Sequence, residues 1–142
     1  MEQKIKVFLD SNVLFSIAYT GREKSRSYLI YEIQAQGSIA IYLSTLVCAE
    51  ATLNVKNKKP DAEKFLEELI ETSVVLEDIT ARLNNPIVNK LPLNDRIILT
   101  TAIGNKMNCF LTGNTKDFAS LYHKKIGDTI ILKPVDFLYG KF

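Results

Sequence analysis

Four acidic residues occupy positions where a carboxylate needs an explanation. Asp10 directly follows the apolar run 5–9, and Asp117 lies shortly after the apolar run 108–111. Glu50 and Asp95 each stand among apolar neighbours, where ionised carboxylates are rarely found unless they are paired or bind a metal. Acidic oxygens with no histidine or cysteine in the set favour a hard cation, Mg²⁺ or Mn²⁺, over zinc. The four residues therefore predict a divalent metal site.

Three neutral polar residues accompany these acids. Asn12 lies two residues after Asp10, and Thr112 and Asn114 follow the same apolar run as Asp117. Side chains of this kind orient metal ligands or phosphate oxygens. Carboxylates brought together raise one another's pKa, and divalent ions make their joint charge tolerable. Two ions spaced about 4 Å apart can activate water for phosphodiester cleavage.

Short apolar runs alternate with helical spacing along the chain, and this pattern predicts the fold. Strands are predicted over 5–9, 39–43, 74–76, 108–111 and 130–132, and helices over 25–36, 46–57, 60–70, 79–83 and 96–106. Helical connections between strands imply crossovers and hence a mainly parallel sheet. We therefore expect one domain over 1–142, an α/β fold with a three-layer α/β/α sandwich and a mainly parallel five-stranded sheet.

The predicted sheet also brings the polar residues together. Ligands of open parallel sheets bind beyond the carboxyl ends of the strands. Asp10 follows the first predicted strand, and Thr112, Asn114 and Asp117 follow the fourth. If these two strands are neighbours, their ends place two carboxylates and several neutral oxygens around one crevice.

Composition supports a globular domain and limits the role of overall charge. The 142 residues are 46% hydrophobic and 24% charged, and a chain of this length buries roughly 70% of its unfolded surface. The net charge of +2 comes from 18 basic and 16 acidic residues, so any attraction to nucleic acid must be local. Cys48 and Cys109 lack zinc or disulfide spacing and are expected to be buried reduced thiols.

No membrane or export signal is expected. The chain reaches Asp10 within ten residues of Met1, too early for the apolar stretch of a signal peptide. No segment approaches the ~18 uninterrupted apolar residues of a membrane-spanning helix. The sequence therefore predicts a soluble, cytoplasmic protein with no membrane partner.

Four segments together resemble the PIN domain, the nuclease fold of VapC-type toxins and of several RNA-processing enzymes. They are IKVFLDSNVL at 5–14, STLVCAE at 44–50, LNDRIILTTA at 93–102 and LTGNTKDF at 111–118. The resemblance covers nearly the whole chain, in the order of the family. It implies an endoribonuclease that uses Mg²⁺ or Mn²⁺, with metal-binding positions on Asp10, Glu50, Asp95 and Asp117 and polar support from Asn12, Thr112 and Asn114.

This chain departs from the family pattern at one position, and the resemblance also implies protein partners. Many family members have a further acid where this chain has Asn114, so a second ion would bind more weakly or arrive only with substrate, and a single-metal site stays open. A VapC-type toxin would form homodimers and be blocked by a cognate antitoxin protein. An RNA-processing nuclease that is not a toxin is equally compatible with these residues.

Two basic groups could contact RNA phosphate. The first comprises Arg22, Lys24 and Arg26, and the second comprises Lys56, Lys58 and Lys59. Runs of charged residues usually form solvent-exposed faces of a protein. The first group is nevertheless preferred because it is expected to lie close to Asp10. Neutralising it is expected to weaken RNA binding and to flatten the salt dependence of that binding.

Each acid also has a purely structural interpretation. Asp10 and Asn12 could cap the following helix, and Asp95 could cap a helix or interact with its dipole. Glu50 could pair with a basic side chain, and Asp117 could be a solvated loop residue. Their joint order favours the metal site over these separate explanations.

Two other functional interpretations compete with a nuclease. A receiver-like phosphorylation switch would use Asp10, Asp78, Thr112 and Lys133, but such a switch wants paired acids where this chain has Asp10 and Ser11. It also gives no role to Glu50. A PIN-like domain without activity could instead serve as a protein-interaction module, against which the presence of all four acids argues weakly.

Overall fold

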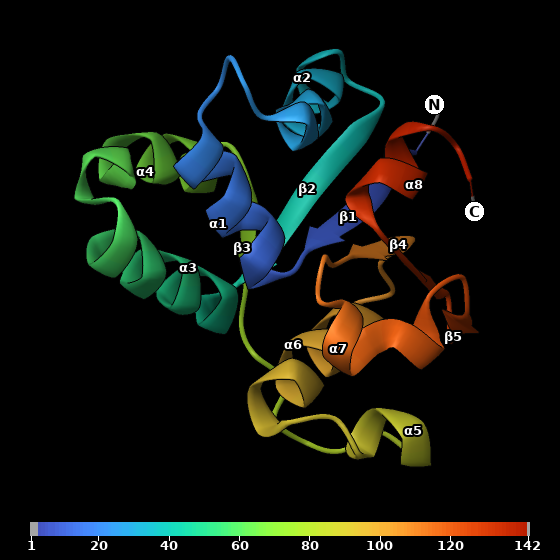
Figure 1. Cartoon of the computed structure of the whole chain (residues 1–142). Helices are drawn as coiled ribbons and strands as arrows, with labels where there is room; N and C mark the ends of the chain where they lie inside the picture. Colours follow the sequence, from blue (N-terminus) through green and yellow to red (C-terminus); the bar gives the residue numbers. More distant parts are fainter. Residues whose placement is uncertain (1–2, 142) are drawn as a thin grey trace.

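A six-stranded sheet with β1 near its middle forms the centre of the fold (Figure 1). The strands are β1 (Ile5–Leu9), β2 (Ile39–Ser44), β3 (Val74–Leu76), β4 (Cys109–Leu111), β5 (Lys125–Ile126) and β6 (Thr129–Leu132). They lie in the order β3-β2-β1-β4-β6-β5 in this computed structural model, which describes residues 3–141. Every pairing is parallel except that of β5 with β6.

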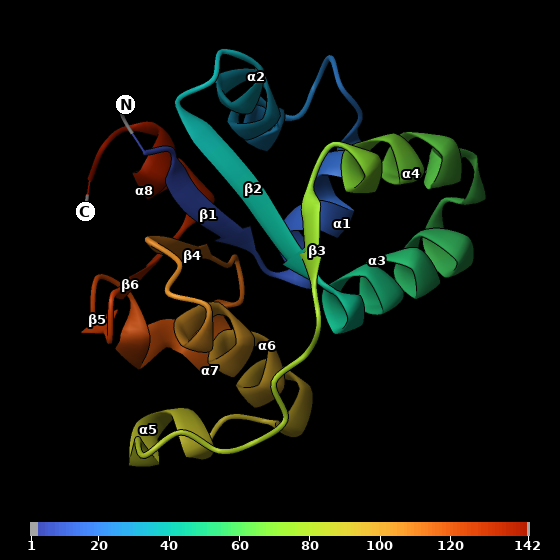
Figure 2. The ribbon, with the colours of Figure 1, turned by 180° about the vertical axis from the view of Figure 1, so that it is seen from behind.

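Helices cover both faces of the sheet. They are α1 (Ser11–Thr20), α2 (Leu29–Ala35), α3 (Thr45–Lys58), α4 (Glu63–Glu71), α5 (Pro86–Asn89), α6 (Leu93–Gly104), α7 (Thr115–Phe118) and α8 (Pro134–Leu138). The views in Figures 1 and 2 place α1 and α6 on opposite sides of the sheet. This follows from right-handed crossovers, because the chain moves outward from β1 to β3 and then returns past β1 to β4. The predicted three-layer α/β/α fold is confirmed.

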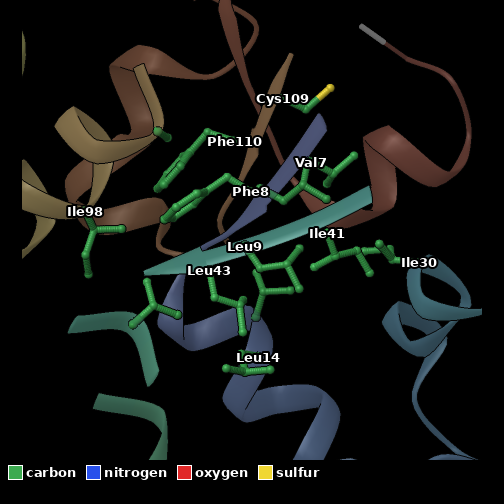
Figure 3. Close-up of a cluster of buried hydrophobic side chains, with 14 of the residues drawn as sticks. Val7, Phe8, Leu9, Leu14, Ile30, Ile41, Leu43, Ile98, Cys109 and Phe110 are labelled. Carbon is green, nitrogen blue, oxygen red and sulfur yellow. The ribbon is translucent and has the colours of Figure 1, made fainter. Parts of the chain in front are cut away.

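The core fills both faces of the central strands (Figure 3). Phe8 and Phe110 are paired in register, and their rings stack with centroids 5.7 Å apart. Leu9 points to the opposite face, toward Leu14 of α1, as the alternation of side chains along a strand requires. Burial on both faces explains why β1 and β4 are apolar almost throughout.

One predicted helix is absent. Residues 77–85 form no helix and run along α6 instead. The backbone N–H of Ile79 donates to the Thr101 hydroxyl at 2.8 Å, and Arg96 donates to the carbonyl of Thr80 at 3.2 Å. The prediction over 79–83 was wrong because side chains of α6 supply the hydrogen bonds that a helix would have formed internally.

The sheet has one strand more than expected. The five predicted strands correspond to β1, β2, β3, β4 and β6, and the addition is β5. Lys125–Ile126 is only two residues long and turns back onto β6 through Gly127, whose φ is +61°. So short a strand has no periodicity to detect, and the prediction of five strands was therefore one short.

The other predicted helices shift by a few residues. The helix expected over 25–36 divides into a 3₁₀ turn, Arg26–Tyr28, and α2, and the one expected from Pro60 begins with the 3₁₀ turn Pro60–Ala62. A third 3₁₀ turn, Ala119–Leu121, follows α7.

Both cysteines are free, and burial raises the pKa of each thiol to about 11. Within residues 3–141, no helix is both long and apolar enough to cross a membrane.

Candidate active site

The site begins where β1 and β4 end side by side. Leu9 is paired in register with Leu111, so Asp10 and Thr112 follow at the same edge of the sheet. The Thr112 hydroxyl donates to Asp10 Oδ2 at 2.8 Å, and the Asp10 backbone N–H donates to the carbonyl of Leu111 at 2.9 Å. The two strands are neighbours, as the predicted crevice required.

Asp10 is a buried carboxylate that also caps a helix. It is 1% exposed, and its Oδ1 accepts a hydrogen bond from the backbone N–H of Ser11 at 2.8 Å, at the start of α1. Burial raises the pKa of Asp10 to about 6, although the hydrogen bonds from Thr112 and Ser11 oppose the shift. The capping interpretation is correct for this residue and does not exclude the chemical one.

Asn12 ties the two strand ends together. Its amide nitrogen donates to Asp10 Oδ2 at 3.0 Å and to the Thr112 hydroxyl at 3.2 Å. Its amide oxygen accepts from the backbone N–H of Gly113 at 2.7 Å. A Cβ on Gly113 would stand 3.2 Å from that oxygen, so glycine allows the close approach. Asn12 therefore positions the Asp10 carboxylate.

Glu50 lies half-buried on α3 and is held by two side chains. The Ser11 hydroxyl donates to Oε1 at 2.8 Å, and the Asn94 amide donates to Oε2 at 2.9 Å. Neither ion pair found within residues 3–141 includes Glu50. Its surroundings are less apolar than expected, since Leu53 is 60% exposed.

The sequence did not predict that Ser11 and Asn94 would hold Glu50. Each is the immediate chain neighbour of a predicted acid, Ser11 of Asp10 and Asn94 of Asp95. That adjacency was the one available signal. Sequence could not connect either residue to Glu50, because the contacts join positions 39 and 44 residues apart in the chain.

Asp95 and Asp117 complete the cluster from α6 and α7. Asn114 caps α7 by accepting from the Asp117 N–H at 3.1 Å, and its amide donates to Asp117 Oδ2 at 3.0 Å. The pKa of Asp95 is raised to about 7, chiefly by burial and then by the charges of Asp10, Asp117 and Glu50. A side-chain interaction with Asp117 also contributes to the raised pKa of Asp95. The fold thus brings all four acids together.

Glu50 and Asp95 line an open pocket of about 520 Å³, and Asp10 and Asp117 are hydrogen-bonded to its lining residues Ser11 and Asn114. Its lining comprises Ser11, Asn12, Glu50, Leu53, Asn54, Asp95, Gly113 and Asn114. These residues come from α1, α3, α6 and the loop after β4. The pocket is therefore at the carboxyl edge of the sheet, where parallel α/β folds place their ligands.

The donor set fits a hard divalent cation. Carboxylates and neutral oxygens lie around the pocket. Burial, reinforced by neighbouring negative charge, raises the pKa of Asp10 and of Asp95, and a bound cation would favour the ionised form of both groups. In the described chain, no three acidic, histidine or cysteine side chains already converge as a closed metal site. Mg²⁺ tolerates this because it keeps several water ligands and uses only one or two carboxylates.

Comparison with protein families identifies the fold's relatives. The PIN domain model matches residues 7–124, a span that contains all four acids. The chain belongs to the PIN domain family. This confirms the resemblance seen in the sequence, and it places the chain in a family of nucleases. The comparison with curated proteins gives no match.

Three solved structures share the fold of this PIN domain. A toxin-antitoxin complex from Klebsiella pneumoniae has 23% identity and a TM-score of 0.58, over 90% of this chain and 97% of the other. VapBC2 from Rickettsia felis, bound to a promoter DNA fragment, has 18% identity and a TM-score of 0.62, over 91% and 98%. FitAcB from Neisseria gonorrhoeae has 17% identity and a TM-score of 0.54, over 91% and 98%.

The preferred basic group lies away from the acids of this PIN domain. Arg22, Lys24 and Arg26 follow the C-terminal end of α1, whereas Asp10 precedes its first residue, about 15 Å away along the helix axis. Arg22 also donates to Glu68 at 3.0 Å. The expectation that this group lies close to Asp10 was wrong because α1 carries the chain away from the site.

Arg22 is engaged in a local clamp. Its guanidinium carbon lies 5.0 Å from the centre of the Phe65 ring and 5.5 Å from that of Tyr28. These side chains help line a separate pocket of about 360 Å³ next to α2 and α4. Arg22 therefore links the 3₁₀ turn before α2 to α4.

The receiver-like arrangement is not formed in this PIN domain. A receiver sheet has the order 2-1-3-4-5, which sets its third strand beside its first, but here β2 separates β3 from β1. Asp78 lies about two strand spacings from Asp10, roughly 10 Å, and accepts from the backbone N–H of Leu46 at 3.1 Å. Lys133 lies over the Tyr122 ring, 5.2 Å from its centre. The fold therefore does not bring together the residues that a receiver-like switch would need.

Proposed function

We propose that this PIN domain is a divalent-metal-dependent endoribonuclease that cleaves RNA phosphodiester bonds. The observation that carries the proposal is the cluster of four carboxylates beside one open pocket, which Glu50 and Asp95 line, with the pKa of Asp95 raised to about 7 and that of Asp10 to about 6. Perturbed carboxylates in a cleft are typical of functional sites, and oxygen ligands without nitrogen or sulfur suit Mg²⁺ or Mn²⁺.

The roles of the side chains follow from their contacts. Asp10, Glu50, Asp95 and Asp117 would hold the ion, directly or through water. A bound divalent ion supplies a nucleophile at neutral pH and stabilises the leaving oxygen. Thr112 and Asn12 fix the orientation of the Asp10 carboxylate. Asn114 holds Asp117 in the same way, and Ser11 and Asn94 hold Glu50.

We further propose that the protein is the toxin of a toxin–antitoxin pair in the cytoplasm. Among the three similar structures, the one from Klebsiella pneumoniae is a toxin–antitoxin complex by name, and the match extends over 97–98% of the chains of all three. A cognate antitoxin protein would then block the pocket, and the active form would be a homodimer. An RNA-processing nuclease without an antitoxin is the alternative, and it would use the same acids.

The test is cleavage of labelled structured RNA by the purified protein with Mg²⁺, Mn²⁺ or EDTA. We expect metal-dependent cutting that falls by at least about a hundredfold in Asp10→Asn and Glu50→Gln, since each change removes a charge from the metal site. The matched control is Glu67→Gln, an exposed acid on α4 away from the pocket. It should cut like the native protein.

Two results would contradict the proposal. One is cutting that persists in EDTA or in both site variants, since it would come from another source. The other is the absence of cutting on a broad range of RNAs by protein that is folded, which would favour an interaction module. Induced expression in bacterial cells separates the toxin from the processing enzyme, because only a toxin should arrest growth in a way that Asp10→Asn abolishes.

A further inference from the structure

Two lysines at the end of α3 lie over two aromatic rings of α1. Lys58 Nζ is 5.4 Å from the centre of the Phe15 ring, and Lys59 Nζ is 5.2 Å from that of Tyr19. The two rings are themselves 5.5 Å apart. Tyr19 is 45% exposed, and both lysines are exposed. Cationic groups, the exposed Tyr19 ring and the half-buried Phe15 ring thus meet on one surface.

This surface continues from the acidic pocket. Helices α1 and α3 lie side by side and both run away from the edge of the sheet that bears Asp10 (Figures 1 and 2). On α3, Glu50 and Asn54 line the pocket, and Lys58 follows at the same helical spacing of four. Eight residues of helix separate Glu50 from Lys58, which is about 12 Å.

A row of residues on α1 runs beside this row on α3 and also lies on a single face of its helix. Asn12 lies in the pocket, and Phe15 and Tyr19 follow three and seven residues later, which keeps all three on one face of the helix. The hydrogen bond from Ser11 to Glu50 joins the two rows at the pocket, and the contact of Lys58 with Phe15 joins them at the far end. One continuous face therefore leads from the acids to the lysines.

Lys59 and Lys58 differ in what they do for the fold. Lys59 Nζ donates to the carbonyl of Tyr19 at 2.7 Å and so satisfies one of the last carbonyls of α1, a common structural role for lysine. Lys58 takes part in neither of the ion pairs found within residues 3–141. Its charge is therefore available to a ligand.

We propose that Phe15, Tyr19 and Lys58 form a contact surface for single-stranded RNA outside the catalytic pocket. The proposal rests on the ribonuclease function proposed above and specifies where its substrate is held. The acidic pocket repels phosphate, so attraction must come from a cationic surface beside it. An exposed ring stacks a base irrespective of its sequence, and a neighbouring lysine contacts the phosphate. At about 3.4 Å per stacked nucleotide, 12 Å places this contact roughly three to four nucleotides from the cut.

The main test measures binding of a fluorescently labelled single-stranded RNA by polarisation, in EDTA and over a series of salt concentrations. Replacing Lys58 by Gln should weaken binding several-fold and should reduce the slope of log K against log salt by about 0.7, the value for one phosphate contact on a single strand. Lys56→Gln is the matched control, because Lys56 belongs to the same basic group in the sequence but lies off the proposed surface. It makes the same charge change in the same turn of α3, but it lies about 200° around the helix from Lys58.

A second variant tests the stacking contact. Tyr19→Leu keeps an apolar side chain but removes the ring, and it should weaken binding by about fivefold or more without changing the salt slope. Thermal unfolding of each variant verifies that the fold is intact. In cleavage assays, Lys58→Gln should slow only those RNAs that extend at least about four nucleotides on one side of the cut.

The outcomes separate this inference from the proposed function. Binding in EDTA requires no cleavage, so a flatter salt slope for Lys58→Gln supports the contact surface whether or not the RNA is cut. Equal salt slopes for Lys58→Gln and Lys56→Gln would overturn the inference even for an active ribonuclease, and would leave this face to a protein partner. Absence of cleavage by the native protein counts against the proposed function alone.

Discussion

Two residues of the site, Asp10 and Asn114, also cap helices of the fold. Asp10 caps α1 through Ser11, and the Asn114 side chain that holds Asp117 also caps α7. Capping requires a side-chain oxygen on the residue just before a helix, and the carboxyl edge of a parallel sheet is where helices begin. The structural and chemical interpretations of these residues therefore coincide, and a cap is no argument against a metal ligand.

The carboxyl of Asp95 should destabilise the metal-free protein at neutral pH. Its pKa is about 7 in the folded chain against an ordinary value of 3.8. Between about pH 4 and pH 7 the unfolded chain has released this proton while the folded chain keeps it, so stability falls as pH rises through that window. We expect Asp95→Asn to raise the melting temperature in EDTA at pH 8 by about 3–5 °C, or about 1 kcal/mol after allowance for solvent screening.

The same variant should gain much less at pH 4, where Asp95 is protonated in the folded chain. Glu63→Gln is the control, because Glu63 lies in the first turn of α4 as Asp95 does in that of α6, away from the pocket. First-turn acids normally stabilise a helix, so this control should lose a little stability at pH 8. A gain for Asp95→Asn that is the same at both pH values would refute the electrostatic explanation.

Asn114 is the residue at which an added charge should strengthen the metal site. Asn114→Asp keeps an oxygen to cap α7 but loses the amide that donates to Asp117 Oδ2 at 3.0 Å. We expect Mn²⁺ to bind several-fold more tightly because the site gains a hard anionic ligand, and the metal-free protein to melt lower because the acids repel one another. Calorimetric titration with Mn²⁺ measures the first effect, and affinity equal to that of the native chain would contradict it.

At the scale of elements, α6 supports the segment 77–85. The hydroxyl of Thr101 accepts the N–H of Ile79 at 2.8 Å, and that N–H would lose its partner in Thr101→Val. Leaving a buried donor unpaired costs about 1–3 kcal/mol. We expect this loss in the free energy of unfolding, measured with urea, together with faster hydrogen exchange at Ile79.

Thr100, the residue before Thr101, provides a control with the same substitution. Thr100 is also fully buried, but its hydroxyl has no hydrogen-bond partner within the described part of the chain. Thr100→Val should therefore be neutral or slightly stabilising, because it removes an unsatisfied polar group. If both substitutions destabilise equally, the hydrogen bond to Ile79 is not what holds the segment.

At the scale of the whole molecule, a bound ion should stabilise the entire fold. The four acids come from the end of β1 and from α3, α6 and α7, so an ion between them joins elements from most of the chain. At a Mn²⁺ concentration 100 times the dissociation constant, the stabilisation is about 2.7 kcal/mol. We expect a rise of roughly 8–13 °C in melting temperature at pH 8, reversed by EDTA and absent in Asp10→Asn. A rise of equal size in Asp10→Asn would place the ion elsewhere.

The sequence by itself determined the local features of this protein. β-Branched and aromatic runs predicted the five main strands, and their alternation with helices predicted the α/β class. The ordered acids Asp10, Glu50, Asp95 and Asp117 were recognisable because each stands against a strand end or an apolar stretch. Each of these signals consists of one residue and its neighbours within a few positions, so short-range sequence patterns are enough to detect it.

Only the tertiary structure decided which distant residues meet. It paired β1 with β4, brought Ser11 and Asn94 to Glu50, and placed Arg22 on Glu68, away from Asp10. Residues 79–83 also form no helix, because side chains of α6 provide their hydrogen-bond partners. Such contacts depend on the order of strands and the directions of helices, which arise when the whole chain buries its apolar surface together. No local pattern along the sequence records that choice.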